Sequence, residues 1–255
     1  MTEQDSLGGN SDQDLSRGLD REKMQILLAA LPHVPFDGWT QVVIDAGVAD
    51  AELDPDLAWR AFPGGPADLV KFFSKYTDRK MVAVLKNTPL EDMRVRERIA
   101  KAVRVRLDLL AGHREPVRRV LAFLALPAHT ALGLSCLART VDEMWRAVGD
   151  TSTDFNFYTK RGLLAGVYGA TLLAWLDDGT EDFSATWTFL DRRIGDVMKI
   201  QKARRRLDKL VAGFPNPLDV LRRFREGRPD KTARNRGDRN GEAQNGEDSP
   251  GEPAA

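Results

Sequence analysis

The sequence contains few of the side chains that bind metals or act as nucleophiles. Its 255 residues include one cysteine, Cys136, and three scattered histidines, His33, His113 and His129. A single cysteine excludes a disulfide within the chain and is typical of a reducing compartment, so we expect Cys136 to be a buried structural thiol. The histidines form neither His-Glu-x-x-His nor Glu-x-x-His, and we expect His129 to be a satisfied interior side chain. The sequence therefore predicts no metal site and no cofactor.

Glycine motifs for phosphate or acyl chemistry are absent as well. The chain has no Gly-x-x-x-x-Gly-Lys, no Gly-x-Gly-x-x-Gly and no Gly-x-Ser-x-Gly. The formal net charge is zero, so the charge of the whole molecule predicts no partner. These absences favour a binding protein over an enzyme that acts alone.

Both ends of the chain are poor in residues that could build a core. Residues 1–19 carry Glu3, Asp5, Asp12 and Asp14 against Arg17, without the apolar run of a secretory signal or the arginines of a transit peptide. Residues 229–255 contain no Leu, Ile, Val, Met or aromatic side chain. Such segments cannot bury enough apolar surface to offset the ordering entropy. We expect residues 1–19 and 229–255 to be disordered tails.

Between these tails the apolar residues recur at helical spacing, and no stretch alternates with a period of two. The first helix should be capped by Asp20 and ended by Pro32, and Gly47 should stop the second. The remaining turns are marked by Pro55, the glycines before Pro66, and Pro127. Helices are therefore expected at residues 20–31, 39–46, 55–62, 67–86, 90–110, 116–126, 128–148, 163–176 and 181–200. The fold class is all-α.

The short helices within residues 20–88, with Ala-Gly-Val at 46–48 and the apolar Phe62 and Leu69, resemble the helix-turn-helix of TetR-type repressors. Residues 37–70 nevertheless carry seven acidic side chains and one basic one, Arg60. DNA binding depends on Lys and Arg that neutralise phosphates. We expect the fold to be kept in degenerate form, without nucleic-acid binding. A ligand-responsive TetR-type regulator is the alternative function.

Residues 89–200 should form the helical core. Residues 117–137 are apolar over more than one face, and residues 163–176 are apolar nearly all round but too short to span a membrane. These helices could enclose an apolar ligand. Gly162, Gly166 and Ala170 lie four residues apart, a spacing that lets another helix approach closely. Close packing within the chain is the favoured explanation, and a dimer contact is the alternative.

Residues 201–228 are predicted to form a basic amphipathic segment. From residue 199 to residue 228 there are ten basic and three acidic side chains, a net charge of +7. An apolar stripe beside a basic face suits an anionic membrane surface. A helix packed on the body with a solvated basic rim is the alternative. The residues expected to dock are Arg204, Arg205, Leu207, Leu210, Val211, Phe214, Leu218, Leu221 and Phe224.

The most informative stretch is residues 141–161. A helix ends in Met144, Trp145 and Val148, and Gly149 is placed for a C′ residue with positive φ. The next helix opens with aromatic residues at 155, 157 and 158. One helical face cannot bury all three, so at least one should be near the surface and mark a binding site. A corner clamped by core aromatics is equally compatible with the pattern.

This stretch reads DEMW at 142–145 and GDTSTDFNFYTKR at 149–161, with support from GWT at 38–40, LP at 126–127 and TWTFL at 186–190 with Arg193. In these motifs the chain resembles the lipid-binding accessory protein family of ubiquinone (coenzyme Q) biosynthesis. The resemblance covers roughly residues 20–202. It implies a TetR-like homodimer without DNA binding, built on the last two core helices. It also implies a cavity for an isoprenoid quinone or another lipid, and a C-terminal helix that docks on the membrane.

The resemblance further implies a partner, the di-iron demethoxyubiquinone hydroxylase. Its binding patch falls on Asp142, Met144, Phe157, Tyr158 and Arg161. Phe157-Tyr158 stands where the family pattern has Trp-Tyr, which removes an indole donor. The residues that we expect to contact the lipid are Leu121, Leu124, Trp145, Leu163, Val167 and Trp187. The acidic N-terminus favours a bacterial cytoplasmic protein that is peripheral on the inner membrane.

Overall fold

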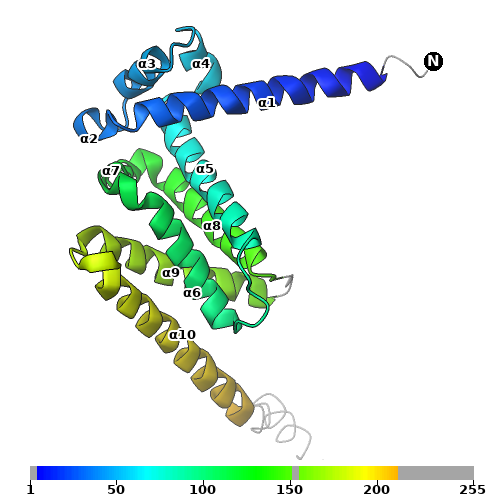
Figure 1. Cartoon of the computed structure of the whole chain (residues 1–255). Helices are drawn as coiled ribbons and strands as arrows, with labels where there is room; N and C mark the ends of the chain where they lie inside the picture. The colour runs from blue at the N-terminus through cyan, green and yellow to red at the C-terminus, as the bar shows by residue number, and fades with distance from the viewer. Residues whose placement is uncertain (1–4, 151–154, 212–255) are drawn as a thin grey trace, which may run out of the picture. The chain divides into compact units, whose positions relative to one another are not determined.

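The computed structural model describes residues 5–150 and 155–211, and within these ranges every regular element is helical. The all-α prediction is confirmed. Figure 1 shows the helices in chain order. They are α1 (Asp5–Ala30), α2 (Val34–Asp37), α3 (Gln41–Asp50), α4 (Leu57–Ala61), α5 (Pro66–Lys86), α6 (Val95–Leu110), α7 (Arg114–Leu124), α8 (Thr130–Ala147), α9 (Phe155–Asp177) and α10 (Ser184–Val211), with short 3₁₀ turns η1 (Ala111–His113), η2 (Pro127–His129) and η3 (Glu181–Phe183).

The chain divides into two compact units, Met1–Gln201 and Lys202–Ala255. The fold described below is that of the first unit. Of the second unit the structure describes only the end of α10, residues 202–211.

Helices α1 to α4 form the N-terminal part, in which α3 lies directly against α1 (Figure 1). Gly47 lies inside α3, so the prediction that it stops the helix is wrong. A Cβ atom at this position would lie 2.7 Å from the carbonyl oxygen of Ile26 and 2.8 Å from the Cβ of Ala30. Glycine is present because two helix backbones meet here. Sequence periodicity cannot distinguish such a contact from a helix end.

The start of the first helix also differs from the prediction. α1 begins at Asp5, so Asp20 lies inside the helix instead of capping it. The Asp20 carboxylate accepts a hydrogen bond of 3.0 Å from Arg79 on α5. α1 is thereby connected to the first helix of the bundle.

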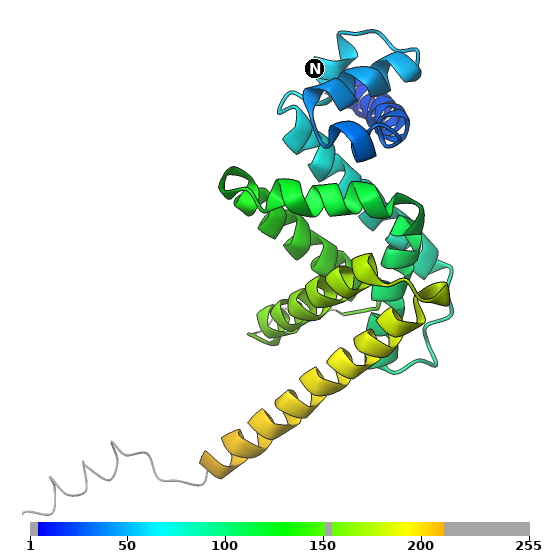
Figure 2. The ribbon, with the colours of Figure 1, turned by 90° about the vertical axis from the view of Figure 1, so that its left-hand side faces the viewer.

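Helices α5 to α9 form the bundle that carries the cavity (Figure 2). α5 packs against both α6 and α8, and α8 packs against α9. Leu90 is buried but precedes α6, which begins only at Val95. At this start the Glu97 carboxylate accepts a hydrogen bond of 3.0 Å from the Arg94 N–H, and the Glu97 N–H donates to the Arg94 carbonyl at 2.8 Å. The break predicted at Pro127 is confirmed, because η2 separates α7 from α8.

The small-residue strip on α9 does not pack as predicted. A Cβ atom at Gly162 or Gly166 would meet no heavy atom of a neighbouring element within 4 Å. No other helix of the first unit therefore approaches the strip closely. Gly162 and Gly166 instead line a shallow surface hollow with Leu163, Val167, Arg193 and Val197.

Among the described helices, none is by itself long and apolar enough to cross a bilayer. The segments Val95–Leu124 and Pro127–Ala147 are together long and apolar enough to cross a bilayer, but the chain bends by 99° between them.

Candidate ligand cavity and partner surface

An apolar cavity of about 370 Å³ lies among α5, α6, α7, α8 and α9. This volume is within the range of small-molecule sites, which span about 300–1,000 Å³. Most of its lining is aliphatic or aromatic. The wall residues are Val70, Phe73, Ser74, Arg106, Leu110, Val117, Val120, Leu121, Leu124, Ala125, Gly133, Cys136, Leu137, Thr140, Tyr168, Gly169, Leu172 and Leu173.

Two of the six residues predicted to contact lipid, Leu121 and Leu124, line this cavity. Leu163 and Val167 lie at the surface hollow on α9. The indole N–H groups of the two tryptophans donate to carbonyl oxygens elsewhere, Trp145 to Lys160 and Trp187 to Asp182. These four residues do not line the cavity. A side chain's position on an apolar helix does not reveal which side of that helix faces empty space.

A buried ionic network adjoins the cavity. Arg106 is 5% exposed; its Nε donates to the Tyr168 hydroxyl at 2.9 Å, and its Nη1 lies 2.7 Å from Asp78 Oδ1. Asp78 also accepts hydrogen bonds from Thr140 Oγ1 at 2.9 Å and from Arg139 Nε at 3.1 Å. Burial alone would lower the pKa of Arg106, but Tyr168 and Asp78 outweigh it, and the pKa is raised above its ordinary value. The guanidinium therefore stays charged beside the apolar chamber.

Sequence reasoning did not identify this network. Asp78 and Arg106 are charged residues within amphipathic helices, where solvent exposure is the ordinary expectation. The only sequence signal is the position of Arg106 between Val105 and Leu107; Asp78 stands in the polar run Thr77-Asp78-Arg79-Lys80 and gives no such signal. Cys136 is buried as predicted, and in addition it lines the cavity. His129 is half-buried, stacks on Phe123 with ring centroids 3.9 Å apart, and bonds to the Phe123 carbonyl through Nδ1.

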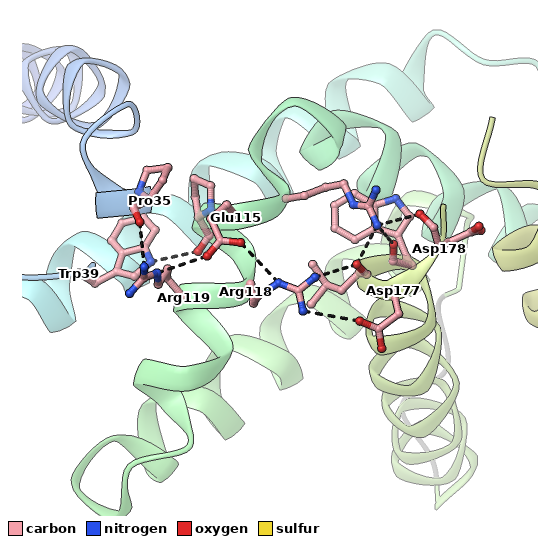
Figure 3. Close-up of polar contacts among 11 residues, drawn as sticks. Pro35, Trp39, Glu115, Arg118, Arg119, Asp177 and Asp178 are labelled. Carbon is pink, nitrogen blue, oxygen red and sulfur yellow. Dashed lines mark hydrogen bonds and ion pairs between the residues drawn. The ribbon is translucent and has the colours of Figure 1, made fainter. Parts of the chain in front are cut away.

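Polar contacts fix the N-terminal half of helix α7 (Figure 3), and Val117, Val120, Leu121 and Leu124 of the same helix line the cavity. On one side Arg119 donates to the Pro35 carbonyl at 2.8 Å, and the Trp39 indole donates to the Pro116 carbonyl at 3.1 Å. On the other side Arg114 donates to the carbonyls that end α9, those of Trp175, Leu176 and Asp178, at 2.7–2.9 Å. Carbonyls at a helix end have no partner within the helix, and Arg114 supplies one.

Ion pairs connect α8 to α9 in the predicted partner patch. We call Asp142, Asp150, Lys160 and Arg161 together the ionic corner. Arg161 Nε donates to Asp142 Oδ1 at 2.7 Å, and Arg161 Nη1 donates to Asp150 Oδ2 at 3.3 Å. Lys160 donates to Asp150 Oδ1 at 2.8 Å. The Arg161 side chain is only 13% exposed, and its guanidinium carbon lies 3.4 Å from the Phe157 ring centroid. Arg161 therefore holds the end of α8 to the start of α9.

The predicted C′ glycine is confirmed, since Gly149 has a φ of 90° and the Asp150 N–H bonds back to the Trp145 carbonyl. Tyr158 is 74% exposed, which confirms the expected surface aromatic, and it packs edge-on against Phe157. Met144 is fully buried, so its assignment to the partner surface is wrong. In a helix that is buried on one side, Met144 takes the inward position that its periodicity with Val141 and Val148 requires.

Five of the nine residues predicted to dock on a membrane lie within the described part of the chain. Helix α10 includes these five residues, Arg204, Arg205, Leu207, Leu210 and Val211. Phe214, Leu218, Leu221 and Phe224 lie outside the described residues. Among the described residues, no three His, Cys, Asp or Glu side chains come together in a way that could hold a metal ion.

A family sequence model and individual related proteins both connect this chain to the COQ9 family. Residues 130–201 match the sequence model of the COQ9 family. The mitochondrial ubiquinone biosynthesis protein COQ9 of Rattus norvegicus is 36% identical over 183 residues, which cover 69% of this chain and 58% of that protein. The Homo sapiens protein of the same name is 34% identical over 202 residues, covering 76% of this chain and 62% of that protein. The chain thus matches 58% and 62% of the lengths of these two relatives.

A TetR transcriptional regulator from Nitrosomonas europaea has a similar structure, with a TM-score of 0.56 and 19% sequence identity, covering 68% of this chain and 95% of that one. At this identity the likeness shows the fold alone. The TetR-like fold and the family resemblance given by the sequence motifs are both confirmed.

Proposed function

We propose that this relative of the COQ9 proteins, built on the fold of TetR regulators, serves ubiquinone biosynthesis as a non-catalytic accessory protein. It binds an isoprenoid quinone intermediate or another lipid in the cavity among α5 to α9. It presents this lipid to the di-iron demethoxyubiquinone hydroxylase at a membrane surface, and it acts as a homodimer. The observation that carries the proposal is a largely apolar cavity in a chain whose named relatives are ubiquinone biosynthesis proteins.

The chemistry of the cavity fits a ligand with a long apolar tail and a small polar head. Aliphatic walls favour an isoprenoid chain, with each buried CH₂ contributing about 0.8 kcal/mol. Polar groups at the wall are few: Ser74, Arg106, Thr140 and Tyr168. The Tyr168 hydroxyl accepts its bond from Arg106, so its own proton remains available for the carbonyl oxygen of a quinone. The polar groups would orient the head group of the lipid, whereas the aliphatic walls would not select one particular tail.

The partner surface is centred on Tyr158. An exposed aromatic ring, held by Phe157 and by the ionic corner of Arg161, is a rigid anchor for a protein interface. Asp142 is 22% exposed and contributes at the edge of the same surface. Location stays a prediction: a bacterial cytoplasmic protein that is peripheral on the inner membrane, held there by residues 201–228. The named relatives are mitochondrial.

Native mass spectrometry of the purified full chain, followed by organic extraction, tests the cavity. We expect a dimer that carries a quinone or another isoprenoid. A matched variant, Leu121→Trp, should fill part of the chamber and reduce the bound lipid severalfold, while the dimer and the melting temperature stay close to those of the parent. Extracts that contain only buffer components would contradict the proposal.

A second experiment tests the partner surface. Tyr158→Ala should weaken binding to the hydroxylase by about tenfold or more, as expected for an aromatic anchor, without loss of stability. Trp59→Ala is the matched control, because Trp59 is 70% exposed on the N-terminal part. Equal binding by the parent and both variants would place the interface elsewhere.

A further inference from the structure

The corner between α7 and α8 has a composition that is unusual for a protein surface. Residues 120–138 include no Asp, Glu, Lys or Arg, and His129 and Cys136 are their only titratable side chains. This charge-free run covers the second half of α7, η2 and the first half of α8. In Figure 2 the corner, drawn in green, projects to one side of the bundle. A protein surface of this length ordinarily carries several charges, since about a quarter of residues are charged.

Much of this run is accessible to solvent. Leu126 is 52% exposed and Leu134 is 63% exposed, and the residues between them include exposed alanines and Pro127. On neighbouring α9, Leu173 is 58% exposed. We call residues 125–134 together with Leu173 the apolar corner. Scattered surface leucines need no explanation, but a continuous uncharged patch marks an interaction site.

The corner supplies partners for several of its own backbone groups. The Ala125 N–H donates to the Leu121 carbonyl at 2.9 Å, and the His129 N–H donates to the Leu126 carbonyl at 2.9 Å. Thr130 Oγ1 donates to the same Leu126 carbonyl at 3.3 Å, and His129 Nδ1 pairs with the Phe123 carbonyl at 3.1 Å. A turn exposed to water does not need to supply its own partners. A turn that enters hydrocarbon does, because no water is present to bond to free backbone groups.

The corner is continuous with the cavity. Ala125, Gly133 and Leu173 belong both to the cavity wall and to the corner. At Gly133 helix α8 lies against the end of α7, since a Cβ there would be in van der Waals contact with the Leu124 side chain at 3.4 Å. Leu126 and Leu134 therefore follow wall residues of the cavity directly in the sequence, and Leu173 is itself a wall residue.

We propose that the apolar corner inserts into one leaflet of a lipid bilayer, so that the cavity opens toward the acyl chains. The occupant is hydrocarbon and not a protein, because protein interfaces have a polar rim with about one hydrogen bond per 100–200 Å². The corner offers no charged group for such a rim. It is a contact separate from the basic segment of residues 201–228, which depends on anionic head groups. That a lipid enters the cavity by this route rests on the proposed function; the insertion itself does not.

Depth measurements on the full chain test the insertion. Cys136→Ala removes the single thiol, and a polarity-sensitive fluorophore is then attached to a new cysteine in the variant Leu126→Cys. The matched control carries the same label in Trp59→Cys. Vesicles of zwitterionic phosphatidylcholine are used, with and without a nitroxide on the acyl chain. We expect a blue shift and nitroxide quenching for the label at position 126, and neither for the label at position 59.

Charge insertion gives an independent measurement. Leu126→Glu together with Leu134→Glu should reduce partitioning onto phosphatidylcholine vesicles by at least about tenfold, because an acidic side chain is costly in hydrocarbon. Trp59→Glu should leave partitioning unchanged. The proposal is overturned if neither label responds to vesicles, or if the label at position 126 shifts with protein concentration alone, which would make the corner an interface between copies. Loss of cavity lipid with retained insertion would refute only the proposed function.

Discussion

The N-terminal helices α1 to α4 are closely packed, whereas the bundle of α5 to α9 contains a cavity. In α1 to α4 the side chains of Ile26, Leu27, Val43 and Ile44 are completely buried, and α3 lies so close to α1 that only glycine fits at position 47. The bundle of α5 to α9 leaves a chamber of about 370 Å³. The difference shows that closely packed regions preserve a fold, whereas a region left unfilled is available for a ligand.

The two regions also place their charges differently. The N-terminal part carries seven acidic side chains and one basic one over residues 37–70, mostly exposed, and so lacks what DNA phosphates require. The bundle instead buries charges, with Asp78 and Arg106 paired beside the cavity. The TetR-like fold is therefore retained in a chain with exposed acidic side chains at residues 37–70 and a buried ion pair beside the cavity.

The largest effect is expected for Arg106→Ala, which removes the buried ion-pair partner of Asp78 and leaves only the partly exposed Arg139. We expect the free energy of unfolding to fall by about 3–5 kcal/mol. Arg96→Ala on the same helix is the control, because this exposed arginine pairs only with Glu97 at 3.5 Å and should contribute less than about 1 kcal/mol. Urea denaturation followed by circular dichroism measures both. Similar losses in the two variants would show that the network is not critical for stability.

Glycine substitutions compare the packing of the two regions directly. Gly47→Ala should lower the free energy of unfolding by about 1–3 kcal/mol, because the new methyl group meets backbone atoms of α1. Gly169→Ala, which faces the cavity with no atom within 4 Å, should be neutral or stabilise the helix by up to about 1 kcal/mol. Thermal unfolding of both variants measures these two changes in stability. Equal destabilisation would mean that the chamber closes in solution.

The junction between α9 and α10 should make stability depend on pH. Hydrogen bonds from the hydroxyl and backbone N–H groups of Thr180 and Thr186 hold the pKa of Asp178 well below its usual range. A lowered folded-state pKa means that the stabilisation is present above the unfolded pKa of about 3.9 and is lost as pH falls through the folded pKa. Asp178→Asn should flatten this acid dependence and cost about 1 kcal/mol at neutral pH. Unfolding curves measured between pH 7 and acid check the prediction, and an unchanged pH profile would contradict it.

The smallest effect is expected in a gel-shift experiment with duplex DNA at low salt, where we predict no retardation. The double variant Glu52→Lys and Asp56→Lys tests whether charge alone prevents binding, since both side chains belong to the acidic segment. A weak, salt-sensitive shift is expected for that variant only. Salt-sensitive binding by the parent chain would favour the TetR-type regulator.

Arg161 shows where the prediction of the partner site was incomplete. The sequence suggested a surface cation, but the structure places its side chain between two carboxylates at 13% exposure. A charge reversal there would disturb the α8–α9 corner as well as any partner contact. Tyr158 tests the interface more cleanly, because its ring is exposed.

Helical periodicity and proline and glycine positions were sufficient to predict most helices, the break at Pro127 and the turn at Gly149. The motif at residues 142–161 was sufficient for the family resemblance. These features depend on local chain geometry, which neighbouring residues determine. Gly47, Met144 and the start of α1 were misjudged because each depends on a contact with another helix or on the direction of a side chain.

The amino-acid pattern was enough to predict an all-α protein, an acidic stretch at residues 37–70, and central helices that are apolar on more than one face. Which of those apolar residues line a chamber, and which pack against one another, depends on the tertiary structure. The tertiary structure also decided that Asp78 and Arg106 meet, although they are 28 positions apart in the sequence. Periodicity specifies the faces of one helix, but a cavity and a buried ion pair exist only where several helices come together.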